Sequence, residues 1–220
     1  MREWPKDLKR AKRLQEILRK KVKIIPLKKH PQYITGVDAA FLNNNVIGVA
    51  CLYNYPEISL IEKTYTVTET LFPYIPGFLS FREGPSIIMA LKGLKRKPDI
   101  ILFDGQGIAH PKRLGIASHI GVLLNIPTIG CAKSRLIGTY KEPGPKKGTC
   151  SSLLYKKEIV GVVLRTKDSV KPLFVSPGNR IDIQGSIEIV LACSQRYRIP
   201  EPLRRADFIS KKIKKELSAG

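Results

Sequence analysis

A short apolar run that ends at an acid constrains the fold of this chain more than any other stretch. Residues 100–103 read I-I-L-F, which predicts a strand buried on both faces in a sheet covered by helices. Asp104 follows at the carboxyl end of the run, and the residues G-Q-G come directly after it. Ligands of α/β sheets bind at the carboxyl ends of strands, and glycine lets the backbone approach a ligand closely. Asp104 is therefore a candidate site residue, although a role limited to capping the next helix fits this segment equally well.

A second strand-like run also carries a single acid. Residues 33–41 read Y-I-T-G-V-D-A-A-F, with Asp38 among apolar neighbours. An isolated ionised carboxylate in a strand core is costly, so it requires a cation or several hydrogen-bond donors. If Asp38 and Asp104 lie on adjacent strands, they place four oxygens near one point, which suits Mg²⁺ or Mn²⁺.

The net charge indicates a polyanionic partner. The 220 residues include 39 Lys and Arg against 18 Asp and Glu, a formal net charge of +21, and a surplus of this size is typical of nucleic-acid-binding proteins. A Lys-rich surface of the kind found in thermophiles is the alternative. Residues 1–30 alone hold 12 basic and 3 acidic side chains. We therefore expect a basic N-terminal helical segment over 1–30 and a catalytic core over 31–210, in one domain that spans 1–220.

Composition also narrows the compartment and the assembly. The four cysteines are far apart and form no C-x-x-C pair, so we expect buried thiols in a reducing compartment rather than a zinc site or a disulfide framework. No stretch resembles a signal peptide or a membrane span. These features predict a cytoplasmic protein without a membrane partner, and a monomer is the default because the sequence carries no interface signal.

The order of the expected elements favours a ribonuclease H-like α/β fold, with a central mixed sheet flanked by helices. The first three strands are expected to form an antiparallel meander, followed by a Pro-rich loop over 71–85 and then a helix that has Pro85 in its first turn and Glu83 just before it. The expected strands span 33–41, 46–53, 58–68, 100–103, 128–132, 151–156, 158–166 and 173–175. The expected helices span 4–22, 85–95, 115–124 and 184–195, and a last helix begins near 199–202.

Five motifs, in this order, resemble the endonuclease V family, also called deoxyinosine 3′ endonuclease. They read V-D-A-A-F, P-Y-I-P-G-F-L-S-F-R-E, D-G-Q-G-I-A-H-P-K-R, G-C-A-K-S and R-I-P-E-P, and they span nearly the whole chain. The resemblance implies a DNA repair endonuclease that recognises deaminated bases, chiefly hypoxanthine, the base of inosine. It implies Mg²⁺-dependent hydrolysis, with Mn²⁺ as a substitute, of the second phosphodiester bond 3′ to the lesion. The implied products carry 3′-hydroxyl and 5′-phosphate ends.

The same resemblance implies roles for individual residues. The implied metal ligands are Asp38, Glu83, Asp104 and Asp207. The implied catalytic set is Asp38, Glu83, Asp104 and Lys133, with Lys133 beside the scissile phosphate. The implied substrate-binding residues are Tyr74, Gly77, Leu79, Gly105, His110, Arg113 and Leu136. Among these, Tyr74 is the implied wedge that fills the gap left in a duplex by a flipped base.

Several of these assignments have simpler alternatives. Glu83 suits a helix N-terminus, where the macrodipole favours an acid, and Asp207 suits a surface helix beside Arg204 or Arg205. A lone His before Pro, as at 110–111, is more often structural than catalytic. For the whole chain, the alternatives are a ribonuclease H-like nuclease with another substrate, an inosine-specific endoribonuclease, and a non-catalytic basic nucleic-acid-binding protein.

The role of Tyr74 is testable by separating recognition from folding. If Tyr74 is a wedge, Tyr74→Ala will reduce cleavage and lesion binding but leave the melting temperature close to wild type, whereas loss of a core aromatic costs about 3–5 kcal/mol. Tyr74→Phe will keep most activity, because filling the gap requires the ring and not the hydroxyl. The measurement is thermal unfolding together with cleavage of duplex and single-stranded substrates, with the larger defect expected on duplex. A Tyr74→Ala variant that melts many degrees lower yet cleaves normally would make Tyr74 a core residue.

Overall fold

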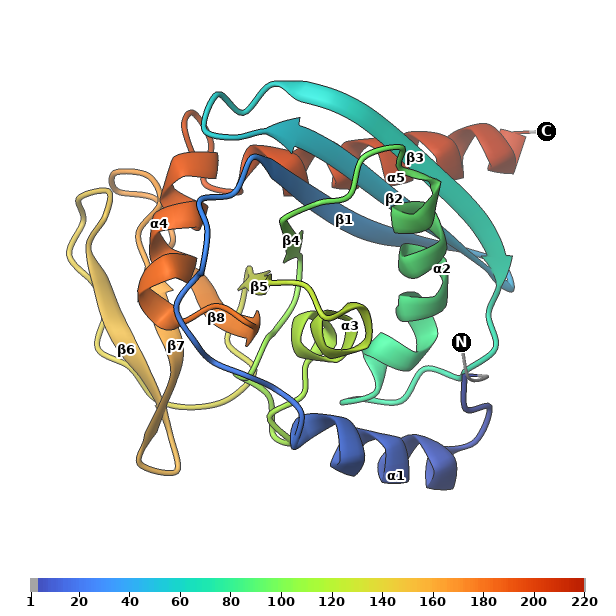
Figure 1. The fold of residues 1–220 in the computed structure, drawn as a ribbon, viewed down its shortest axis with the longest axis horizontal. Coiled ribbons are helices and arrows are strands. Elements are labelled where there is room, and N and C mark those ends of the chain that lie inside the picture. Colours follow the sequence, from blue (N-terminus) through green and yellow to red (C-terminus); the bar gives the residue numbers. More distant parts are fainter. Residues whose placement is uncertain (1–3, 220) are drawn as a thin grey trace.

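The structure of this chain, a computed structural model, describes residues 4–219. Residues 1–3, which belong to the expected N-terminal helical segment, and residue 220 lie outside the described residues. Over 4–219 the chain forms a mixed eight-stranded sheet and five helices (Figure 1). The strands are β1 (Tyr33–Leu42), β2 (Asn45–Asn54), β3 (Leu60–Glu69), β4 (Ile100–Phe103), β5 (Thr128–Ala132), β6 (Cys150–Tyr155), β7 (Glu158–Leu164) and β8 (Leu173–Asn179). The helices are α1 (Leu8–Arg19), α2 (Leu79–Gly93), α3 (Ile116–Leu124), α4 (Ile183–Cys193) and α5 (Glu201–Ala219).

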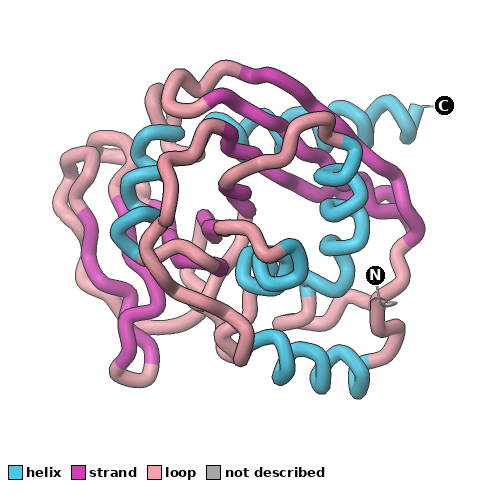
Figure 2. The backbone as a smooth tube through the Cα atoms, in the orientation of Figure 1, coloured by secondary structure: helices cyan, strands magenta, loops and turns pink. Residues whose placement is uncertain are grey.

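The sheet has the strand order β3-β2-β1-β4-β5-β8-β7-β6. Strands β1, β2 and β3 form the expected antiparallel meander, and β4 pairs in parallel with β1 on one side and β5 on the other. Strands β8, β7 and β6 continue the sheet with antiparallel pairing. Figure 2 shows these strands in magenta with helices around them. No helix within 4–219 has the length and apolar character that a membrane crossing requires.

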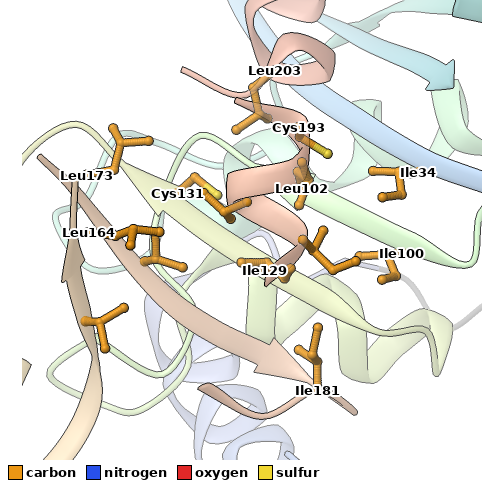
Figure 3. Packing of buried hydrophobic residues seen from close by; sticks show 14 residues of the cluster. Ile34, Ile100, Leu102, Ile129, Cys131, Leu164, Leu173, Ile181, Cys193 and Leu203 are labelled. Atoms are coloured by element: carbon orange, nitrogen blue, oxygen red, sulfur yellow. The ribbon is translucent and has the colours of Figure 1, made fainter. Parts of the chain in front are cut away.

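Strand β4 is buried on both faces, as its sequence predicts, and it anchors the centre of the sheet. All four of its residues are buried. Ile100 and Leu102 pack with residues of β5, α4 and α5 on one face (Figure 3), and Ile101 and Phe103 pack with α2 and α3 on the other. Each such side chain contributes about 1.5–3 kcal/mol on burial. The end of β4, where Asp104 begins, is therefore held rigidly between two helical layers.

Helix α1 lies beside α3, outside the two layers that sandwich the sheet (Figure 1). It is shorter than the predicted 4–22, because Asp7 caps its start by accepting a hydrogen bond from the Arg10 amide at 2.8 Å. Ala11 packs against Phe72 and Phe81, which anchors the helix to the loop before α2 and to the first turns of α2.

The start of α2 was predicted at Pro85, but the helix begins at Leu79 and contains Pro85 in its interior. An interior proline costs about 3 kcal/mol or more, so the sequence rule places a proline in the first turn of a helix. The prediction based on that rule was wrong. Here the helix buries Phe81, Ile87 and Ile88 on either side of the proline, and their burial outweighs that cost. Glu83 therefore lies within α2 and not just before it.

Strand β8 is also longer than predicted. The residues S-P-G-N at 176–179 were expected to lead into the next helix, but β8 continues through them to Asn179. Pro177 pairs with Ile129 beside a register shift in β5, and such irregularities are where a sheet tolerates proline.

Gly36 on β1 lies so close to α5 that an added Cβ would be 2.2 Å from the carbonyl carbon of Pro202. Backbone atoms cannot move aside as a flexible side chain can, so we expect Gly36→Ala to displace α5 and to cost about 1–3 kcal/mol or more. Gly93→Ala is the matched control, because its nearest neighbour is Thr64 at 3.5 Å and alanine favours the helix. Denaturant unfolding of both variants checks the expectation. A Gly36→Ala protein as stable as wild type would contradict this contact.

Candidate active site

Asp38 and Asp104 are brought together by the parallel pairing of β1 and β4. Val37 on β1 is in register with Phe103 on β4, so the next residue along each strand direction is an aspartate. The two acids therefore lie side by side at one edge of the sheet, as the sequence predicted for adjacent strands.

Lys133 directly follows β5, the other neighbour of β4, and its ammonium forms an ion pair with the Asp104 carboxylate. The backbone carbonyl of Lys133 accepts a hydrogen bond from the Arg198 guanidinium at 3.1 Å, and the same guanidinium donates to the Pro172 carbonyl at 2.9 Å. Arg198 thus ties the segment that carries Lys133 to the chain before β8.

Helix α5 supplies the other polar groups near Asp38. The Ser210 hydroxyl donates to the Asp38 carboxylate. Asp207, one turn earlier, pairs with Lys211 at 2.8 Å, whereas Arg204, one of its expected partners, pairs with Glu201. Asp207 therefore faces the site closely enough for its charge to raise the pKa of Asp38.

A cavity of about 450 Å³ reaches this site at Asp104, whereas Asp38, Glu83 and Asp207 do not line it. Its walls come from the loop before α2, the loop after β4 and the residues after β5. Eight residues expected at the site line it together: Tyr74, Gly77, Leu79, Asp104, Gly105, His110, Lys133 and Leu136. The cavity therefore unites segments that are up to about 60 residues apart in the sequence.

Two expected substrate-binding residues have roles that the sequence did not reveal. Arg113 does not line the cavity; its guanidinium pairs with Glu158 and lies over the Tyr155 ring. His110 does line the cavity, but burial lowers its pKa to about 4, against the opposing effect of a hydrogen bond with the Gly77 backbone. His110 is therefore neutral near neutral pH, which favours the structural role.

Tyr74 is exposed at the rim of the cavity. Its exposed fraction is 68%, which excludes the alternative that it packs in the core. Arg82 lies 6.0 Å from the centre of its ring. The ring is therefore available to a ligand that enters the cavity.

Comparison with known proteins identifies the family. A family model described as Endonuclease V matches residues 16–208. The chain belongs to the endonuclease V family. This confirms the resemblance predicted from the motifs. It also confirms the predicted activity class, a DNA repair endonuclease, which is a phosphodiester hydrolase.

Proteins named endonuclease V match this chain over nearly its whole length. The endonuclease V of Dictyoglomus turgidum is 51% identical over 201 residues, which cover 91% of this chain and 88% of the relative. The crystal structure of endonuclease V from Streptomyces avermitilis has a TM-score of 0.93 at 39% identity, covering 98% of this chain and 96% of that one. A structure from Ciona intestinalis, in complex with a 23mer DNA containing an inosine followed by a ribo-adenosine, has a TM-score of 0.85 at 29% identity, with coverage of 96% and 98%. The predicted ribonuclease H-like α/β fold is confirmed.

The acids of this family member share one electrostatic environment. Burial raises the pKa of Asp38 to about 6; the charges of Asp207 and Asp104 act in the same direction, and the Ser210 hydrogen bond opposes them. Burial also raises the pKa of Glu83 to about 8, with help from the charges of Asp38 and Asp104. Burial alone would lower the pKa of Lys133, but the hydrogen bond and charge of Asp104 outweigh it and raise that pKa. The site therefore holds more negative charge than Lys133 alone compensates.

These acids offer the oxygen ligands and the negative charge that a divalent cation requires. Carboxylate oxygens are the ligands that Mg²⁺ prefers, and a cation would relieve the repulsion among them. Within residues 4–219, no three His, Cys, Asp or Glu side chains are grouped as ligands of one ion; Asp104 and Asp38 instead contact Lys133 and Ser210. Each contact uses one carboxylate oxygen, so the other oxygen of Asp38 and of Asp104 would be open to an ion.

Sequence reasoning missed three side chains that shape the site. Ser210 and Arg198 contact Asp38 and the Lys133 segment, and Gln106, which lines the cavity, donates to the Ser134 carbonyl at 3.2 Å. Gln106 had a signal, because it stands between two glycines directly after Asp104. Arg198 also had a signal, because it begins the R-I-P-E-P motif, although the motif does not reveal its partner. Ser210 had none, since Asp38 lies far away in the sequence.

The raised pKa of Glu83 predicts how stability depends on pH without metal. The unfolded chain titrates this group near its ordinary pKa of about 4.3, so its protonated form stabilises the folded state at low pH. That contribution is lost as the pH rises through about 8, the folded value. We expect the metal-free melting temperature to fall between about pH 5 and about pH 9, and Glu83→Gln to reduce the fall, by about 2–4 °C for each kcal/mol recovered.

Added Mg²⁺ should raise the melting temperature more at high pH than at low pH, because it binds ionised carboxylates. Glu57→Gln, an exposed acid in the β2–β3 connection, is the matched control and should leave both effects unchanged. Parallel pH curves for wild type and Glu83→Gln would contradict the shift.

Proposed function

We propose that this family member cuts a nucleic-acid strand that carries hypoxanthine, in a Mg²⁺-dependent reaction at the second phosphodiester bond 3′ to that base. The products would carry 3′-hydroxyl and 5′-phosphate ends. The observation that carries the proposal is that Asp104 and Lys133 belong both to the cavity and to the acidic site. A base bound in the cavity would therefore hold its own strand against the acids. The inosine-containing DNA in the Ciona intestinalis structure supports this substrate class.

Recognition of hypoxanthine requires a pocket that distinguishes it from adenine and guanine. Hypoxanthine offers a 6-oxo acceptor and an N1 donor, and it lacks the 2-amino group of guanine. Gly77 and Gly105 line the cavity, and with no side chain there the backbone can contact the edges of a flipped base. Tyr74, exposed at the rim, would fill the gap that the base leaves in the duplex.

Hydrolysis is assigned to the acids and to Lys133. Asp38, Glu83, Asp104 and Asp207 would hold Mg²⁺, or Mn²⁺ in its place. Such an ion, when bound, activates water and neutralises charge on the reacting phosphate. Lys133, released from Asp104, would place its ammonium against a phosphate oxygen, and Arg198 would keep the Lys133 backbone in position.

RNA is a second candidate substrate. The DNA in the Ciona intestinalis structure contains an inosine followed by a ribo-adenosine, which supports a substrate that carries ribose. The net charge of +21 favours binding of either polyanion, because phosphate contacts dominate affinity and carry no sequence information.

The test is cleavage of matched DNA and RNA oligonucleotides with one inosine, or with adenosine at the same place, in Mg²⁺. We expect cleavage of inosine strands at the second bond 3′ to the base and little cleavage of adenosine strands. Asp104→Asn should reduce cleavage by more than about 100-fold, because it removes a direct metal ligand. Loss of a residue that only hydrogen-bonds to a metal ligand typically reduces activity by about 10–100-fold. It should leave inosine-specific binding in Ca²⁺ within a few-fold, because the cavity and the basic surface remain.

Asp168→Asn is the matched control, since Asp168 is an exposed acid between β7 and β8 whose side chain is 59% exposed. It should cleave like wild type. Equal cleavage of inosine and adenosine strands would contradict the substrate, and wild-type turnover of Asp104→Asn in Mg²⁺ would contradict the metal assignment.

A further inference from the structure

Gln15 is a buried polar residue on the inner face of α1. Its exposed fraction is 1%, and it lies between the buried Ala11 and Leu18 on a helix whose outer face is basic. Burying an amide is unfavourable unless it is hydrogen-bonded. The Gln15 Nε2 donates to the backbone carbonyl of Gly77 at 3.1 Å, across 62 residues of sequence. This bond joins the N-terminal helix to a wall of the cavity.

Gly77 belongs to a tight turn in that wall. The Phe78 amide donates to the Ile75 carbonyl at 3.0 Å, with Pro76 and Gly77 between them and a φ of +82° at Gly77. Proline followed by glycine with positive φ is the pattern of a type II turn. Tyr74 directly precedes this turn, so the orientation of the turn sets the direction of its ring.

The Gly77 turn is a junction between three segments. Besides Gln15, which bonds to the Gly77 carbonyl, the His110 ring from the loop after β4 lies beside Gly77. Beside Gln15, the Glu16 carboxylate pairs with Lys112 of that same loop at 3.6 Å. That ion pair is exposed and so contributes little, whereas the Gln15 bond is shielded. Helix α1 therefore contacts both loops that face each other across the cavity.

We propose that Gln15 is a positioning residue for base selection: by holding the Gly77 carbonyl, it fixes the turn that bounds the cavity and so sets the room available to the base. The proposal rests on the proposed function of the cavity as a base pocket. Guanine differs from hypoxanthine by one amino group, so a small displacement of this wall decides whether guanine enters. Binding sites of this kind tolerate displacements of only about 0.5 Å.

The test compares Gln15→Met with Leu18→Ala. Met keeps the volume and loses the donor, whereas Leu18→Ala weakens the packing of the same helix face without touching Gly77. Cleavage of oligonucleotides with inosine and with guanosine is measured well below the melting temperature of each variant. We expect Gln15→Met to lower the inosine preference by about tenfold, the effect of about 1.4 kcal/mol, and to raise KM for inosine more than it lowers kcat. Leu18→Ala should lower the melting temperature and leave the preference unchanged.

Three outcomes would overturn the proposal. An unchanged preference in Gln15→Met would show that the bond does not set the pocket, and so would an equal loss of preference in Leu18→Ala at a matched drop in melting temperature. If Gln15→Met does not fold, Gln15→Asn, whose shorter amide cannot reach Gly77, takes its place, and an unchanged preference there has the same meaning. Failure of the proposed function is distinguishable, because wild type itself would then show no inosine preference.

Discussion

Burial of neighbouring carboxylates at one edge of a parallel strand pair is the constraint on which this site depends. The β1–β4 register places Asp38 next to Asp104, and the burial of β4 on both faces prevents either strand from moving away. The cost is visible in the pKa of Asp38, raised to about 6, and of Glu83, raised to about 8, with burial as the main cause. Lys133, which follows β5, offsets part of this negative charge by pairing with Asp104. The remaining charge is what an oxygen-loving cation would neutralise.

The sheet and the loops contribute differently to the site. The acids are at strand ends or on helices packed against the sheet, where apolar burial fixes them. The cavity walls are loops, and loops owe their shape to specific hydrogen bonds rather than to regular pairing. The Gly77 carbonyl, which accepts from Gln15, is the clearest example. In the function proposed above, reaction chemistry would lie on the part of the molecule fixed by apolar burial, and base selection on the loops held by a few polar contacts.

Helix α1 combines two roles on its two faces. Its outer face presents exposed lysines and arginines, which suit the phosphates of a nucleic acid. Its inner face buries Ala11 against Phe72 and Phe81 and donates from Gln15 to Gly77. The basic N-terminal segment is therefore not simply a charged attachment, because the same helix braces the wall of the cavity.

We could predict the buried strand β4, the acids at its end and on β1, and the family from the sequence, because apolar runs and contiguous motifs are local properties of the chain. The sequence also indicated that Tyr74 was a candidate wedge, and the exposure of its ring agrees. The folded chain was needed to show that Pro85 lies inside α2, that Arg113 pairs with Glu158 outside the cavity, and that Gln15 reaches Gly77. The reason is physical: a local pattern records period and burial, whereas the partner of a polar side chain depends on which distant segment packs against it.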